Sequence, residues 1–260
     1  MDDGRVGAII RNMHCDVTEL TDFYRRPLGQ MVRRLLSHRL RARARNVAGQ
    51  TVIGLGFATP YLSMFRGEAR CVGALMPAAQ GALVWPSEDA VQTALVDEEH
   101  LPLADNSVDL LIGIHCLEMA ERVRPLLREL WRVLRPDGRL ILIVTNRTSI
   151  WARLDRTPFG HGRPFSRGQI ERLLADSLFA AGEWSHALHV PPLEWSFIMR
   201  SSPAFERAGA RLTPGIGGVI LVEARKELAQ PIGGHRQRQR SGMFAPIGRP
   251  AMPKNTHFGN

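Results

Sequence analysis

Short, continuous apolar runs separated by longer amphipathic stretches are the feature that most limits how this chain can fold. Residues 108–114 read VDLLIGI and residues 140–144 read LILIV. Runs of this kind lack the polar alternation of a half-exposed strand and are typical of strands that are buried on both faces. Such strands occur in parallel sheets that helices cover on both sides. The chain is therefore expected to form an α/β domain.

Further segments with strand or helix character alternate along the chain. The expected strands are residues 51–55, 70–74, 91–96, 108–114, 140–144, 184–190 and 219–224, and the expected helices are residues 28–45, 60–65, 123–134 and 166–181. Ser166 and Gln169 have the spacing of a capping box, and the sequence RPDG at residues 135–138 is expected to end the third helix with a turn. This order predicts a doubly wound, Rossmann-like sheet of seven mostly parallel strands with helices on both faces.

Both ends of the chain differ from this central pattern. Residues 28–45 carry apolar side chains at helical spacing on one face and basic side chains, from Arg33 to Arg45, on the other. Residues 226–260 are rich in Gly, Pro, Gln and Arg and are expected to be a disordered basic tail. We therefore expect an N-terminal extension over residues 1–49, an α/β domain over residues 50–225 and a tail over residues 226–260.

Charge and composition exclude some classes of protein and leave others open. The net charge is +9, which admits nucleic acid, anionic lipid or an acidic protein as a partner. Almost all basic residues are arginines, and this bias fits a GC-rich genome as well as it fits a ligand. The sequence contains no apolar run of about 18 residues, so no integral membrane contact is expected. Acids at the N-terminus do not fit a signal peptide, and a cytoplasmic location is expected.

The three cysteines, Cys15, Cys71 and Cys116, are too few for a disulfide framework. None of them has C-x-x-C spacing. The histidine–cysteine neighbours at residues 14–15 and 115–116 are adjacent pairs rather than ligand clusters. No metal site is therefore expected from the sequence.

Three segments carry the most specific motifs of the chain. Residues 51–62 read TVIGLGFATPYL, residues 101–119 read LPLADNSVDLLIGIHCLEM and residues 126–146 read LLRELWRVLRPDGRLILIVTN. Together they resemble the class I S-adenosylmethionine-dependent methyltransferases, specifically the methyltransferase type 11 group, over residues 50–147. The resemblance implies S-adenosyl-L-methionine as cofactor, methyl transfer as the activity and a small molecule as acceptor.

In the family that this chain resembles, the loop after the first strand lets the backbone approach the methionine part of the cofactor. Gly56 stands at the first glycine of that loop, whereas Gly54 replaces an acid, and Ala58 and Pro60 replace two later glycines. Ala58 adds one methyl group, and Pro60 removes an N–H group but suits the first turn of a helix. The segment is therefore interpreted as a modified cofactor loop that keeps its turn.

The acid that ends the second strand, and binds both ribose hydroxyls in this family, is absent. Leu75 or its neighbour Met76 stands in its place, and unpaired hydroxyls in a buried site cost on the order of 1–3 kcal/mol. Asp97 and Glu98 follow the third strand and are the acids that remain to contact adenine or ribose. The resemblance thus assigns cofactor-binding positions to Gly54, Gly56, Ala58, Leu75, Asp97 and Glu98.

Two histidines are candidates for acid–base catalysis. His115 follows the fourth strand, near the expected place of the sulfonium group, and His161 lies between two glycines in the segment RTPFGHGRPFS, residues 156–166. Arg163 in that segment is a candidate for pairing with an anionic acceptor. Residues 22–24, DFY, suggest a lid from the N-terminal side. For each histidine and for the segment, a structural role is the alternative.

Two other functions fit the same sequence. The departures at Gly54, Ala58, Pro60 and Leu75 also fit a catalytically inactive protein of this fold that acts as an interaction or regulatory partner. The basic face from Arg33 to Arg45, with the basic tail, also fits RNA binding, which predicts an affinity that falls steeply with salt. The sequence does not define the acceptor or the atom that is methylated.

Overall fold

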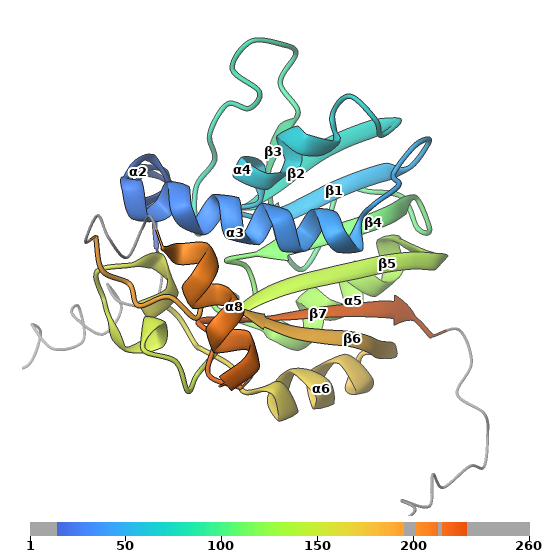
Figure 1. Ribbon diagram of the computed structural model, residues 1–260. Coiled ribbons are helices and arrows are strands. Elements are labelled where there is room, and N and C mark those ends of the chain that lie inside the picture. Colours follow the sequence, from blue (N-terminus) through green and yellow to red (C-terminus); the bar gives the residue numbers. More distant parts are fainter. Residues whose placement is uncertain (1–14, 195–200, 213–214, 228–260) are drawn as a thin grey trace, which may run out of the picture. The chain divides into compact units, whose positions relative to one another are not determined.

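The computed structural model describes residues 15–194, 201–212 and 215–227, which form one seven-stranded sheet with helices on both faces (Figure 1). The strands are β1 (Thr51–Gly56), β2 (Cys71–Pro77), β3 (Thr93–Val96), β4 (Val108–Ile114), β5 (Leu134–Thr145), β6 (Phe179–Ala187) and β7 (Val219–Lys226). Their order across the sheet is β3-β2-β1-β4-β5-β7-β6, and β7 runs antiparallel to both of its neighbours. The expected doubly wound, mostly parallel sheet is confirmed.

The continuous apolar runs place the central strands in the core. Every residue of β4 except Asp109 is buried, and so is every residue of β5 from Leu140 onward. Buried apolar surface contributes about 25 cal/mol per Å², so these two strands account for much of the stabilisation of the sheet.

Helices cover the two faces of the sheet and complete two hydrophobic clusters. Helices α2 (Val17–Arg25), α3 (Pro27–Arg43) and α4 (Thr59–Leu62) contribute to one cluster, and α5 (Val123–Val133) and α6 (Arg167–Asp176) contribute to the other. Helix α8 (Ser202–Leu212) follows β6, and single 3₁₀ turns cover residues 63–65, 151–153 and 158–160. The expected helix over residues 28–45 is confirmed as α3, which Pro27 begins.

The start of α6 is confirmed, whereas its end differs from the expectation. Ser166 Oγ accepts a hydrogen bond from the N–H of Gln169, whose side chain accepts one from the N–H of Ser166. The helix ends at Asp176 rather than at residue 181. Leu178 adopts a left-handed φ of 60°, which ends the helical path and directs the chain into β6.

The turn expected at residues 135–138 is replaced by a bulge within β5. Helix α5 runs directly into this strand. Val108 pairs with Leu134 whereas Leu110 pairs with Arg139, so the four residues between the paired positions of β5 leave the ladder.

Helices α2 and α8 lie in segments for which the sequence pattern gave no helix. α2 is short, and only Leu20, Phe23 and Tyr24 of its residues are buried. Its first turn is fixed by Asp16, whose side chain accepts from the N–H of Thr18 at 2.6 Å. Helix α8 lies in the connection between β6 and β7, of which residues 195–200 and 213–214 lie outside the described part.

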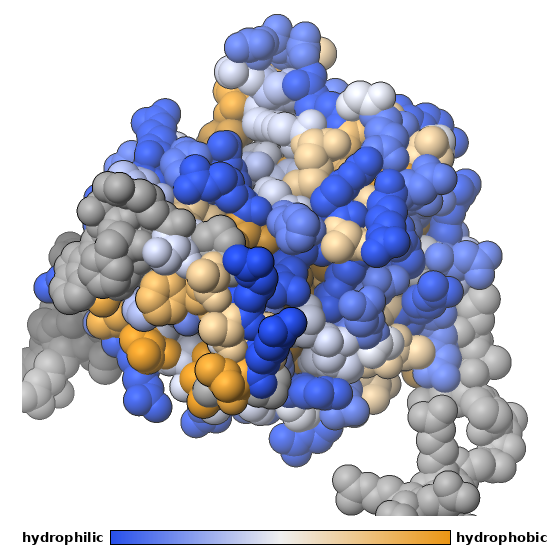
Figure 2. Space-filling view, in the orientation of Figure 1, coloured by the Kyte–Doolittle hydropathy of each residue, from blue (hydrophilic) through white to orange (hydrophobic). Residues whose placement is uncertain are grey.

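Several arginines of the basic face of α3 bind other parts of the same chain. Arg41 pairs with Glu68 at 2.5 Å, Arg39 pairs with Glu206 at 3.5 Å, and Arg43 donates to the hydroxyl of Ser185 at 2.8 Å. Figure 2 shows a mostly hydrophilic surface over α3, with hydrophobic residues gathered near α8. Nucleic-acid binding through Arg33–Arg45 stays a prediction.

The described residues belong to one compact unit, in which α2 and α3 share a core with the strands of the expected α/β domain. Apart from Lys226 and Glu227, the expected basic tail lies outside the described residues. No helix in the described part of the chain has the length and apolar character needed to cross a membrane.

Candidate functional site

The carboxyl ends of β1 and β4 lie side by side at the place where the strand order reverses. Ligands of open α/β sheets bind outside the strands at such a point. Gly56 ends β1 with a φ of 75°, and a Cβ at this position would collide with the carbonyl oxygen of Ile114. Glycine is therefore required here, and the turn expected in the modified cofactor loop is present.

Gly54 and Ala58, which both depart from the family motif, face each other. Gly54 lies within β1, and a Cβ built on it would be 2.6 Å from the Cβ of Ala58 and 2.7 Å from a methyl group of Leu62. The methyl group of Ala58 thus occupies the space that a side chain at position 54 needs. The residues at positions 54 and 58 therefore depend on each other, because only one of the two positions has room for a methyl group. Gly54 lies within β1 and not at the turn itself.

Aromatic side chains fill the space beside the turn. We call Tyr24, Phe57, Tyr61, His115 and Phe159 the aromatic cluster; all five are buried. Phe57 stacks on Tyr24 with ring centroids 5.5 Å apart, and its N–H donates to the carbonyl of Ile114 at 2.9 Å. His115 packs on Phe159 at 4.7 Å between ring centroids. The loops after β1 and β4 are therefore joined to each other and to α2.

A chain of hydrogen bonds runs through the aromatic cluster. Tyr61 donates its hydroxyl proton to the hydroxyl oxygen of Tyr24, which lies 2.9 Å from Nε2 of His115. Burial, with a smaller contribution from His161, lowers the pKa of His115 to about 3. The imidazole is therefore neutral, and its Nε2 accepts the proton of Tyr24.

The loop after β2 also reaches His115. The side-chain amide of Gln80 donates to the backbone carbonyl of His115, and the backbone carbonyl of Gln80 accepts from the N–H of Val17 at 2.8 Å. Gln80 Oε1 is buried without a hydrogen-bond partner. Gln80 therefore connects the start of α2 to the end of β4 and leaves one acceptor unused beside the aromatic cluster.

Glu118 holds the segment 156–166 against the end of β4. Its side chain accepts from the N–H of Thr145 at 2.6 Å, and its backbone carbonyl accepts from the N–H of Arg163 at 2.8 Å. Burial raises the pKa of Glu118. Arg163 is thus positioned through its backbone, and its side chain is exposed.

The ends of β2 and β3 do not bring an acid to the place of the family's ribose-binding residue. Leu75 is buried in the hydrophobic cluster beneath α5. Asp97 lies 3.0 Å from the ring of His100, and this bond lowers the pKa of Asp97. Glu98 accepts from the N–H of Glu121 at 3.2 Å, and its partial burial raises its pKa. Asp97 is thus engaged within its own loop, and Glu98 is engaged with the segment that follows β4.

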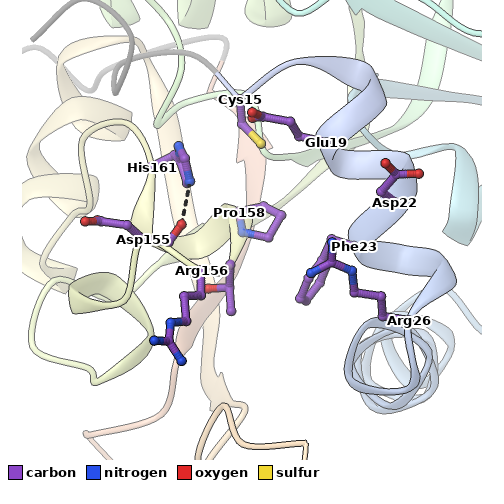
Figure 3. A pocket seen from close by; sticks show the side chains of 10 residues that line it. Cys15, Glu19, Asp22, Phe23, Arg26, Asp155, Arg156, Pro158 and His161 are labelled. Carbon is purple, nitrogen blue, oxygen red and sulfur yellow. Dashed lines mark hydrogen bonds between the residues drawn. The ribbon is translucent and has the colours of Figure 1, made fainter. Parts of the chain in front are cut away.

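Two pockets flank the aromatic cluster. One, of about 310 Å³, adjoins the modified loop and is lined by Phe57 and Pro60 together with Arg25, Arg33 and Trp85. The other, of about 220 Å³, lies between α2 and residues 155–161 (Figure 3). His161 lines this second pocket and is not brought beside the modified loop.

The fold and these motifs were compared with known proteins. Residues 43–142 match the family described as a methyltransferase domain. This part of the chain is therefore similar to methyltransferase domains in sequence, and the sheet has their Rossmann-like fold. A ubiquinone/menaquinone biosynthesis C-methyltransferase of Rubrivivax gelatinosus is 31% identical over 125 residues, which are 47% of this chain and 50% of that protein. The chain spans no more than half the length of the curated relatives that it matches.

Solved structures of the same domain resemble this chain in fold. A methyltransferase of Thermotoga maritima, described as a possible histamine N-methyltransferase, has a TM-score of 0.54 at 17% identity, covering 81% of this chain and 96% of that one. Geranyl diphosphate C-methyltransferase of Streptomyces coelicolor, solved with S-adenosyl-L-homocysteine, has a TM-score of 0.51 at 18% identity, covering 74% and 76%. Likeness at these identities establishes the methyltransferase fold.

Sequence reasoning missed Gln80 and Tyr61 and gave Tyr24 only as part of a lid. The segment 22–24 does lie on α2, and Phe23 and Tyr24 are buried against the site. A buried glutamine and two tyrosines 37 positions apart have no sequence spacing that indicates a shared hydrogen-bond chain. The aromatic residue at position 57, directly after the turn glycine, is the one signal that could have indicated the cluster.

Proposed function

We propose that this chain is an S-adenosyl-L-methionine-dependent methyltransferase that acts on a small-molecule acceptor. The observation that carries the proposal is the glycine turn at Gly56, which lies at the reversal of strand order within the matched residues 43–142. Ligands of such sheets bind at this point.

The turn and the adjoining pocket fit the methionine end of the cofactor. In this proposal the backbone after Gly56 approaches the methionine, and Arg25 or Arg33 pairs with its carboxylate, since both arginines line the 310 Å³ pocket. The cofactor supplies an electrophilic methyl group on a sulfonium sulfur. The chain's contribution is to position the acceptor, from which much of the rate of such a transfer can come.

His115 is the histidine placed to act as a base in this proposal. It directly follows Ile114, which is bonded to the modified loop. Its ring is neutral and can accept a proton, but burial lowers its pKa to about 3, so it becomes an effective base only when the aromatic cluster opens. The hydroxyl of Tyr24 is hydrogen-bonded to Nε2 of this ring at 2.9 Å. Tyr24 would therefore have to move before Nε2 could accept a proton from an acceptor molecule. His161 and Arg163 remain candidates for contacts with the acceptor.

The ribose end of the cofactor does not fit as well, because Leu75 offers no acceptor for the hydroxyls. Wild-type protein is therefore expected to bind the cofactor weakly. Leu75→Asp is expected to tighten binding by about 10- to 150-fold, since one hydrogen bond to a charged group contributes about 1.5–3 kcal/mol. Isothermal titration with S-adenosyl-L-methionine and S-adenosyl-L-homocysteine measures both affinities.

Leu75→Asn is the matched control, because it has the shape of aspartate without its charge. Met76→Asp repeats the test at the neighbouring position if a carboxylate at residue 75 unfolds the core. We expect a measurable heat of binding with wild-type protein. We also expect Leu75→Asp to increase the affinity for the cofactor more than Leu75→Asn does. Absence of binding up to millimolar concentration in wild-type protein and both aspartate variants contradicts the proposal.

One observation favours a second candidate, the catalytically inactive protein of this fold. Phe57, Tyr24 and His115 fill the position between β1 and β4 with buried side chains of the chain itself. In this alternative the aromatic cluster is a permanent core, and the chain serves as an interaction partner. The same titration separates the two candidates, because a permanent core leaves no room for the cofactor.

A further inference from the structure

A cysteine, a glutamate and a histidine converge in the second pocket, away from the modified loop. The candidate ligand atoms of Cys15, Glu19 and His161 all lie within 4.8 Å of one another. Figure 3 shows the three side chains approaching one another from α2 and from the segment that contains His161. Cys15 precedes α2 and Glu19 lies in its first turn, whereas His161 comes from a segment far along the chain.

The hydrogen bonds of His161 leave one ring nitrogen available. Nε2 lies 3.1 Å from the backbone carbonyl oxygen of Asp155, so Nε2 carries the proton and donates it. Nδ1 is then the unprotonated nitrogen, and it is buried without a hydrogen-bond partner. A histidine that donates one N–H to a backbone carbonyl and keeps the other nitrogen free has the arrangement of a metal ligand.

The other two groups complete a set that suits one class of metal ion. Cys15 is buried and makes no disulfide, and Glu19 is exposed, so its carboxylate can turn toward the other two groups. In a tetrahedral zinc site, ligand atoms lie about 3.3–3.6 Å apart, given metal–ligand distances of about 2.0–2.3 Å. The present separations, all within 4.8 Å, exceed this range by no more than about 1.5 Å, which small rotations of the three side chains can close.

We propose that Cys15, Glu19 and His161 bind a zinc-like divalent metal ion that joins α2 to residues 155–161. Thiolate and imidazole ligands favour zinc over magnesium or calcium, which prefer oxygen. Three protein ligands leave a fourth position, which faces a pocket also lined by Arg26 and Arg156. These two arginines suit an anionic ligand at that position. Such a site could not be predicted from sequence spacing, because His161 lies far along the chain from Cys15 and Glu19.

Cobalt(II) absorption tests the proposal on the full chain after reduction and treatment with a chelator. Co²⁺ added to wild-type protein is expected to give a thiolate-to-metal charge-transfer band at one equivalent, and Zn²⁺ is expected to remove it by displacement. Cys15→Ser should abolish the band. His161→Gln and Glu19→Gln should weaken Zn²⁺ binding by more than the roughly 10–100-fold that loss of an outer-shell partner costs.

Cys71→Ser and His100→Gln are the matched controls, because Cys71 and His100 are exposed and do not line the pocket. Both controls are expected to keep the band and the Zn²⁺ affinity. Loss of the band in Cys71→Ser, or a band that survives in Cys15→Ser, overturns the proposal, as does absence of any band in wild-type protein. If Cys15→Ser does not fold, His161→Gln, which changes a half-exposed loop residue, provides the test through its Zn²⁺ affinity. Unchanged affinity in that variant likewise overturns the proposal.

Zn²⁺ binding has a second readout that is independent of methyl transfer. An ion held by both α2 and residues 155–161 stabilises the folded state, so Zn²⁺ is expected to raise the midpoint of thermal unfolding of wild-type protein. Because a thiol binds zinc as the thiolate, binding should release a proton and strengthen as pH rises. A midpoint that Zn²⁺ raises equally in wild-type protein and Cys15→Ser would place the ion elsewhere and refute the site.

Discussion

Gly54→Ala is expected to lower the free energy of unfolding by about 2–3 kcal/mol, because overpacking of a tight core costs about this much. The new Cβ would lie 2.6 Å from the Cβ of Ala58. The backbone fixes the position of this Cβ, which has no other rotamer to adopt. Leu62 also lies near, but its methyl group can move to another rotamer. The contact with Ala58 therefore dominates the cost.

The double variant Gly54→Ala/Ala58→Gly separates this contact from other effects. Ala58→Gly alone is expected to cost about 1 kcal/mol through the loss of a buried methyl group and the greater freedom of glycine. In the double variant the new methyl group at residue 54 enters the space that residue 58 vacates. We therefore expect a favourable coupling free energy of about 1–2 kcal/mol between the two substitutions.

Urea denaturation of wild-type protein, the two single variants and the double variant measures the coupling free energy. The matched control is Gly73→Ala with and without Ala58→Gly, because Gly73 lies in β2 and a Cβ there contacts Ile53 rather than Ala58. Additive free energies are expected in the control pair. Additivity in the Gly54 pair would show that the two positions do not share space in solution, and that the two departures from the family motif are independent.

The sequence predicts those parts of the fold that depend on local pattern. β4 and β5 were recognisable because both are buried on both faces and hence continuously apolar. The start of α6 was recognisable because a capping box uses residues three apart. α2 was not, since three buried positions in a short helix give too little periodicity to distinguish it from a loop.

The site was predictable only where one residue determines the backbone. Gly56 was identified from its place in the loop motif of the family, and the structure gives the physical reason, because a turn that approaches Ile114 so closely excludes every side chain. Leu75 was identified as a missing acid, but sequence alone could not show that its side chain packs in the core. The bond between Tyr24 and His115 joins residues 91 positions apart, and no local rule predicts contacts at that separation.

His115 is expected to make the protein sensitive to mild acid. Its folded pKa of about 3 is below the ordinary value of 6.5, so the folded state resists protonation that the unfolded state accepts. The stability that this group contributes is complete above pH 6.5 and is lost as pH falls toward 3. By linkage the loss approaches about 1.4 kcal/mol per pH unit, or about 2 kcal/mol between pH 7 and pH 5.

Comparison with His115→Asn isolates this contribution from those of other groups. Asparagine tolerates the left-handed φ of 52° at this position and does not ionise. The variant loses the bond to Tyr24 at every pH, so its stability is lower by a constant amount. The advantage of wild-type protein over the variant is expected to shrink by about 2 kcal/mol between pH 7 and pH 5, as measured by urea denaturation.

His100→Asn is a control of opposite sign. The hydrogen bond to Asp97 raises the pKa of His100, so its contribution is present at low pH and is lost as pH rises. The advantage of wild-type protein over His100→Asn is therefore expected to grow as pH falls. Glu118 has a raised pKa and Asp109 a lowered one. Both groups are present in wild-type protein, His115→Asn and His100→Asn, so their contributions cancel when the stabilities of these proteins are subtracted.

The pH dependence of His115 also bears on the choice between an active and an inactive domain. A loss of about 2 kcal/mol requires that His115 is buried and neutral in solution, and hence that Tyr24 and Phe57 close over the end of β1. A cofactor must then open the aromatic cluster to bind, so its affinity is reduced by the cost of opening. A pH dependence equal in wild-type protein and His115→Asn would instead mean that the ring already contacts water. The space beside Gly56 would then be accessible, and weak cofactor binding would have to be attributed to Leu75 alone.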